Sequence, residues 1–180
     1  MFSFADVVRH ELQHLIGLKL SRMALAADMR TIQFGNTEAR MGWGGGVVGE
    51  YGLHVQCPWR LENDTGIITG NDDLYVPSKR GDQLVESFDW EKGGSLQDEA
   101  LRDLLGGYDP DTKQIVNSTN LLTVDAVQTD VAGGFCLSLS GGYRFLVFVN
   151  GTNREAWRLF KPSKDGTKSN EKHFVVPIED

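Results

Sequence analysis

Residues 53–62 alternate apolar and polar side chains more regularly than any other stretch of this chain. One set of positions is apolar and the other is polar or proline: Leu53, Val55, Cys57, Trp59 and Leu61, against His54, Gln56, Pro58, Arg60 and Glu62. A period of two residues is typical of a β-strand with one buried face. Because Pro58 cannot donate a hydrogen bond to a neighbouring strand, we expect an edge strand or a local irregularity at this position.

Strand signals recur along much of the chain, separated by short turns. Residues 18–34 predict two strands joined by a tight turn near Ala27-Asp28. Residues 120–160 predict several more strands, with Gly133-Gly134 and Gly141-Gly142 as turns between them. These segments favour a mostly antiparallel arrangement, because short turns join neighbouring strands in opposite directions.

Two helices are predicted from their capping residues. Ser3 with Asp6 forms a plausible capping box, and Gly17 lies where such a helix would end. Ser95 with Asp98 predicts a second helix near residues 95–106. We therefore predict an α+β fold over a single domain, residues 1–180. Its mostly antiparallel β structure is a sandwich or roll of about eight strands, with an N-terminal helix and the further helix near 95–106.

Length and charge limit the classes of function. The chain has 180 residues and a formal net charge of −7, which argues against nonspecific nucleic-acid binding because that needs clustered Lys and Arg. The N-terminal residues lack the pattern of a secretory signal, and no apolar run approaches the roughly 18 residues of a membrane helix. Two cysteines form neither a disulfide framework nor a metal knuckle. We expect a cytoplasmic protein with no membrane partner.

The sequence HELQH, residues 10–14, carries the sharpest chemical signal. His-Glu-x-x-His on a helix is the zinc signature of many metallopeptidases. In that chemistry His10 and His14 would bind the metal one helical turn apart, and Glu11 would activate the bound water as general base.

Two observations weaken the zinc interpretation. A catalytic site needs a third protein ligand, and no histidine follows the motif closely; His54, His173 and scattered carboxylates such as Glu38 remain as candidates. An amphipathic surface helix also explains the same residues without metal. We therefore predict no cofactor and no catalytic residue. Zinc bound by His10 and His14, with Glu11 as base, is kept as the alternative.

Charged residues elsewhere predict a possible surface site. Trp59-Arg60 and Trp157-Arg158 each place an aromatic ring on one face of a strand and a guanidinium on the other. If the two strands were neighbours, Arg60, Arg158 and Glu155 would form an ion-pair cluster or an anion site. Asp72 and Asp73 follow Asn71 in an acidic turn, where carboxylates either bind a divalent cation or form the turn itself. The possible surface site is Arg60, Asp72, Asp73, Glu155 and Arg158.

Three segments, GLHVQCPWRLE, GIITGNDDLY and EAWRLF, resemble a group of uncharacterised small bacterial proteins. The resemblance implies a cytoplasmic, β-rich domain and brings no known activity. Some bacterial domains of this size and acidity act as immunity proteins, which is an analogy of size and charge. We predict a noncatalytic protein-interaction or accessory domain, of which an immunity-type role is one form, with another protein, a basic one, as partner. The alternative is a zinc-dependent hydrolase.

Overall fold

A computed structural model of the chain describes residues 3–39, 47–80, 87–109, 111–112, 114–116, 118–162 and 173–177. Its architecture is α+β and rich in antiparallel β structure, as predicted. The described residues form fourteen strands, and the sequence predicted about eight. Several of the additional strands are only two residues long, too short to leave a periodic signal in the sequence.

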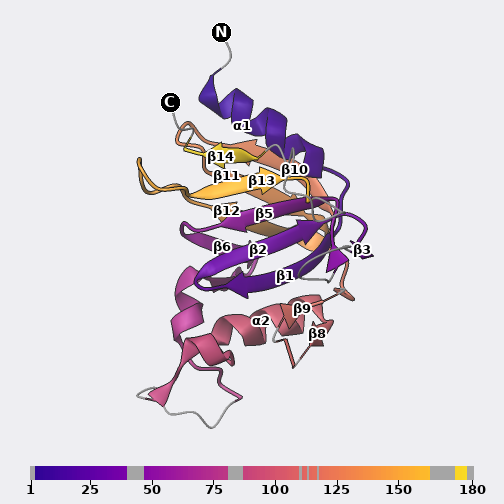
Figure 1. Cartoon of the computed structure of the whole chain (residues 1–180), viewed down its shortest axis with the longest axis vertical. Helices are drawn as coiled ribbons and strands as arrows, with labels where there is room; N and C mark the ends of the chain where they lie inside the picture. The colour runs from indigo at the N-terminus through magenta and orange to yellow at the C-terminus, as the bar shows by residue number, and fades with distance from the viewer. Residues whose placement is uncertain are drawn as a thin grey trace.

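Two antiparallel sheets make up most of the protein (Figure 1). The seven-stranded sheet contains, in spatial order, β14 (Phe174–Val176), β13 (Trp157–Phe160), β5 (Tyr51–Val55), β2 (Met29–Phe34), β1 (Leu20–Ala26), β9 (Gln114–Ile115) and β8 (Tyr108–Asp109). The five-stranded sheet contains β10 (Val124–Thr129), β11 (Phe135–Leu139), β12 (Tyr143–Val147), β6 (Trp59–Asn63) and β7 (Gly66–Gly70). A separate pair joins β3 (Glu38–Ala39) and β4 (Val47–Val48).

The alternating stretch 53–62 is divided between the two sheets. Regular pairing stops after Val55 and resumes at Trp59, so the chain leaves the seven-stranded sheet and enters the five-stranded one. The irregularity predicted at Pro58 is therefore confirmed. All five apolar side chains of the stretch are buried, including Cys57 at the crossing. The alternation of apolar and polar side chains continues from one sheet into the other because the inner faces of both sheets pack in one core.

Both predicted helices and their capping boxes are confirmed. α1 (Phe4–Leu12) begins after Ser3, whose hydroxyl accepts the amide N–H of Asp6, and it continues as the 3₁₀ turn η1 (Gln13–Leu15). α2 (Leu96–Leu105) begins after Ser95 in the same way. Each box satisfies backbone N–H groups that the first turn of a helix leaves unpaired.

The helices lie at opposite ends of the sandwich (Figure 1). α1 packs beside the edge strand β10, where the Thr129 hydroxyl donates to the Ala5 carbonyl at 3.0 Å. α2 packs against β7 and the 3₁₀ helix η2 (Asn71–Tyr75), and the Gln97 side-chain amide donates to the Gly70 carbonyl at 2.7 Å. Such helices cover strand edges that would otherwise offer unpaired backbone groups to another chain.

Aromatic side chains from both sheets meet in the core. The indole N–H of Trp157 donates to the Gly133 carbonyl at 2.8 Å, and the Phe135 ring meets the Trp157 ring edge-on with centroids 5.0 Å apart. Trp59 and Phe145 pair within the five-stranded sheet, with centroids 5.3 Å apart. A fully buried apolar side chain contributes roughly 1.5–3 kcal/mol, so these rings stabilise the packing of one sheet on the other.

Candidate functional site

The five residues of the predicted surface site fall into two groups on opposite faces of the sandwich. Arg60 lies on β6, which pairs with β12 and β7 in the five-stranded sheet. Arg158 lies on β13, which pairs with β5 and β14 in the seven-stranded sheet. The strands are not neighbours, so the predicted cluster of Arg60 with Arg158 and Glu155 does not form. Each arginine points outward because the tryptophan before it points into the core.

Arg60, Asp72 and Asp73 do lie together, around one cavity of about 290 Å³ beside η2. We call this cavity the η2 hollow. It is lined by Pro58, Trp59, Arg60, Ile67, Gly70, Asn71, Asp72, Asp73 and Phe148. Two of its apolar side chains are open to solvent, with Ile67 66% and Phe148 39% exposed. The hollow therefore combines an apolar surface with charges of both signs.

The Arg60 guanidinium is held in place by its neighbours. It lies over the Phe148 ring, 5.1 Å from the centroid, and its Nε donates to Glu62 at 2.6 Å. Glu62 also accepts a hydrogen bond from Arg144 at 2.9 Å. The bond from Arg144, and after it the one from Arg60, lowers the pKa of Glu62. The Glu62 carboxylate offsets the charge of Arg60. Arg60 therefore contributes mainly the flat surface of its guanidinium to the hollow.

The two aspartates of the hollow have different roles. Asp73 accepts hydrogen bonds from the Thr69 hydroxyl at 2.9 Å and the Gly70 N–H at 3.1 Å, which fixes the start of η2. This agrees with the turn-forming interpretation of the acidic turn. The neighbouring Asp72 is exposed. Asp72 is therefore the carboxylate that the hollow offers to a binding partner.

Glu155 and Arg158 belong to a second cluster, on the outer face of the seven-stranded sheet. Arg158 Nε donates to Glu155 at 2.5 Å, and the Gln56 side-chain amide donates to the same carboxylate at 2.8 Å. Next to this ion pair, the Phe160 ring meets His54 edge-on, with centroids 4.7 Å apart. His173 stacks on the Phe160 ring at 4.9 Å. Burial, and then the charge of Arg158, lowers the pKa of His54.

The HELQH residues lie at the end of α1 and in η1. His10 and His14 are exposed, with ring centroids 5.9 Å apart, and Glu11 is half-buried. The His14 ring stacks on Tyr51 of β5 at 6.0 Å, and the Gln13 amide lies 3.2 Å from His10 Nδ1. Among the described residues, no three His, Cys, Asp or Glu side chains are grouped so that they could hold a metal ion. The zinc alternative thus has its two histidines but no third ligand from the described chain.

Cys57, which precedes Pro58 of the η2 hollow, is part of the core. Cys57 is 5% exposed, and burial raises its pKa to about 11. The thiol is therefore protonated at neutral pH and is a poor nucleophile. His54 points to the outer face of the sheet, so the two side chains form no catalytic pair, as the alternation predicted.

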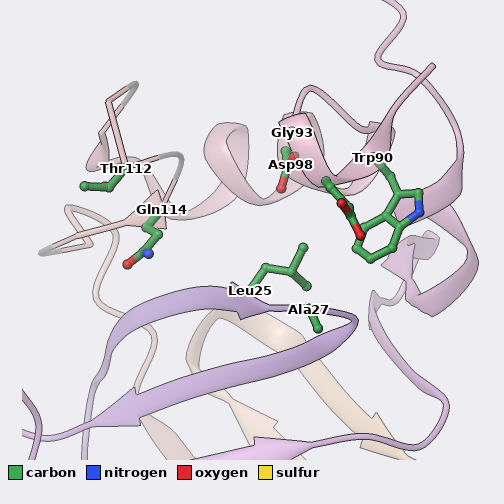
Figure 2. Close-up of a pocket in the computed structure, with 8 residues that line it drawn as sticks. Leu25, Ala27, Trp90, Gly93, Asp98, Thr112 and Gln114 are labelled. Atoms are coloured by element: carbon green, nitrogen blue, oxygen red, sulfur yellow. The ribbon is translucent and has the colours of Figure 1, made fainter. Parts of the chain in front are cut away.

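A second cavity, of about 270 Å³, lies between α2 and the β1–β2 hairpin (Figure 2). We call it the α2 pocket. It is lined by Leu25, Ala27, Trp90, Glu91, Gly93, Asp98, Thr112 and Gln114. None of these residues was predicted as a site, because they come from four separate segments that only the tertiary fold brings together. Only Trp90 could have indicated this pocket from the sequence, because it is a large aromatic side chain in an otherwise polar stretch.

Comparisons of this chain with protein-family models, curated proteins and solved structures find no match. The resemblance to small bacterial β-rich proteins stays a prediction. In the described part of the chain, no helix is long and apolar enough to cross a membrane.

Proposed function

We propose that this protein is a noncatalytic interaction domain that binds a basic protein partner through the η2 hollow. The observation that carries the proposal is the convergence of exposed Ile67 and Phe148 with the exposed carboxylate of Asp72 around one cavity. Exposed apolar side chains beside a charged rim are typical of protein-binding surfaces.

The charge of the chain supports a basic partner. The formal net charge of −7 attracts a cationic protein at long range and accelerates encounter. Within the hollow Arg60 is offset by Glu62, and Asp73 is engaged at the start of η2. Asp72 thus sets the local charge, and it favours a lysine or arginine placed next to an apolar side chain of the partner.

This role fits a cytoplasmic accessory protein. Both cysteines are free, as expected in a reducing compartment. An immunity-type protein, which neutralises a basic toxin, is one concrete form of the proposal and shares its chemistry.

The test compares proteins retained from a cell lysate by the wild type and by Ile67→Ser. We expect a basic protein that the wild type retains and Ile67→Ser loses. The matched control is Val131→Ser, because Val131 is 87% exposed in the β10–β11 turn and does not line the hollow.

The purified candidate partner is then titrated against the three proteins. A dissociation constant raised about tenfold or more by Ile67→Ser, and unchanged by Val131→Ser, supports the hollow as the binding site. Equal retention by all three proteins, or no retained protein, would refute it.

A further inference from the structure

The α2 pocket has two polar sides separated by an apolar floor. Figure 2 shows Thr112 and Gln114 on one side, Trp90 on the other, Asp98 and Gly93 above, and Leu25 with Ala27 below. The cavity volume of about 270 Å³ suits a single side chain or a small molecule. This arrangement favours an elongated ligand with an apolar middle.

The side with Trp90 is suited to a cation. Trp90 begins the 3₁₀ helix η4 (Trp90–Lys92), and its ring meets Tyr75 edge-on with centroids 5.6 Å apart. Glu91 is exposed and lines the pocket. An indole face and a carboxylate are the groups that bind guanidinium and ammonium ions in proteins.

Asp98 supplies a second carboxylate in a fixed position. Its Oδ2 accepts the N–H of Gly94 at 3.1 Å and the N–H of Ser95 at 3.3 Å, as part of the α2 capping box. The described residues donate no hydrogen bond to its Oδ1, which leaves that atom for a ligand. The helix cap thus fixes the carboxylate before any ligand arrives, and a preorganised group binds at a lower entropic cost.

The buried guanidinium of Arg30 also contributes to the charge around Asp98. Arg30 is 3% exposed, and the Asp98 charge acts on it. Its Nε and Nη2 have no hydrogen-bond partner among the described residues. The Asp98 charge is partly offset by Arg30, and the exposed Glu91 carboxylate adds a negative charge at this side of the pocket. The pocket therefore favours a ligand with a single positive charge at this side.

The opposite side of the pocket offers a hydrogen-bond donor. Arg22 donates to the side-chain oxygen of Gln114, which turns the Gln114 NH₂ group away from Arg22. The Thr112 hydroxyl donates to Asp109 at 2.8 Å, so its oxygen can only accept from a ligand. A ligand carbonyl is the group that suits the Gln114 NH₂.

We propose that the α2 pocket binds the basic side chain of a polypeptide. The guanidinium or ammonium lies against Trp90 and between the Glu91 and Asp98 carboxylates, the aliphatic stem crosses Leu25, and the backbone carbonyl accepts from Gln114. This site is separate from the η2 hollow and does not depend on the role proposed for the hollow.

The test is an NMR titration that follows the indole N–H of Trp90, assigned with Trp90→Phe. The probe is N-acetylarginine amide, which carries both a guanidinium and peptide carbonyls. N-acetylcitrulline amide is the neutral control of the same shape, and agmatine is the free cation without carbonyls. Variant Glu91→Gln removes one pocket charge, and Asp125→Asn removes an exposed charge on β10, far from the pocket in sequence and outside its lining.

We expect saturable binding of the arginine probe and none of the citrulline probe in the same concentration range. Glu91→Gln should weaken binding about fivefold, while Asp125→Asn should change it less than about twofold. Equal binding of arginine and citrulline probes, or equal effects of the two variants, would overturn the cation site. Agmatine binding as tightly as the arginine probe would overturn the assignment to a polypeptide.

Discussion

The guanidinium of Arg30 lies over the ring of Trp59, with its central carbon 5.9 Å from the ring centroid. The two residues come from different sheets, β2 and β6, so this contact joins the layers of the sandwich. Burial lowers the pKa of Arg30 to about 10, which leaves it charged at neutral pH. The cation–π contact offsets only part of the cost of burying the charge.

The first prediction concerns the stability cost of this buried arginine. Two of its nitrogen atoms have no hydrogen-bond partner in the part of the chain that the structure describes, and an unsatisfied buried polar group costs roughly 1–3 kcal/mol. Arg30→Met keeps the apolar stem and removes the charge, so we expect the free energy of unfolding to rise by about 1 kcal/mol. Urea denaturation at pH 7 measures the change.

Arg30→Ala is the control for side-chain volume. It removes the charge and also leaves a cavity between the sheets, so we expect it to be less stable than Arg30→Met by about 2 kcal/mol or more. If the Met variant is clearly less stable than the wild type, the attraction between Arg30 and Asp98 and the contact with Trp59 outweigh the cost of burying the charge.

The second prediction concerns Gly52 and Phe160. A Cβ atom at Gly52 would lie 2.5 Å from Cζ of the Phe160 ring. We expect Gly52→Ala to displace the ring from its edge-on contact with His54 and its stack with His173, and to lower the free energy of unfolding by about 1 kcal/mol. Thermal denaturation of the variant beside Gly151→Ala measures this, because a Cβ at Gly151 would meet nothing within 4 Å.

A double-mutant cycle separates this clash from a backbone effect. In a Phe160→Ala background the obstacle is gone, so Gly52→Ala should then cost little. If Gly52→Ala destabilises the protein equally in that background, its effect comes from the backbone of β5 and not from the Phe160 ring.

The third prediction is a pH dependence from His54. Burial and Arg158 lower its pKa in the folded state below the ordinary 6.5. Between the two pKa values the unfolded chain binds more protons, so the folded state loses stability as pH falls below about 6.5. Because carboxylates also titrate at lower pH, the informative quantity is the difference between wild type and His54→Gln.

Urea midpoints at pH 7.5 and 5.5 measure this difference. The wild type should lose more stability on acidification than His54→Gln, which has no charge to gain at this position. Parallel losses in both proteins would mean that His54 protonates as easily in the folded state as in the unfolded one.

Local signals in the sequence predicted much of the fold. The capping boxes at Ser3 and Ser95 predicted the two helices, and the turn at Ala27-Asp28 predicted the first hairpin. Each signal depends on residues within a few positions of one another, so it can be recognised without knowledge of long-range contacts. The structure adds that Arg30 shares the inward face of β2 with Ile32 and Phe34, a burial that the sequence analysis did not predict for a charged residue.

Long-range pairing could not be predicted in the same way. Alternation in residues 53–62 continues across two sheets, because both present an inner face to the same core. Nothing in the period therefore reveals that Arg60 and Arg158 lie on opposite faces. The η2 hollow also needs Phe148 beside Pro58, a contact fixed by the hydrogen bond from the Phe148 N–H to the Pro58 carbonyl at 2.9 Å. The sequence supplied the charged residues of the hollow but not its apolar surface.

The last prediction concerns metal binding by HELQH. A zinc hydrolase needs three protein ligands, and α1 ends at Leu12, so His14 lies in the 3₁₀ turn with its ring stacked on Tyr51. We therefore expect protein purified without a polyhistidine tag to contain well under one equivalent of zinc by mass spectrometry. His14→Ala should give the same background content and only a small change in the unfolding midpoint, since the side chain is exposed and loses only its stack on Tyr51. About one equivalent of zinc in the wild type, lost in His14→Ala, would instead support the hydrolase alternative and place Glu11 as its general base.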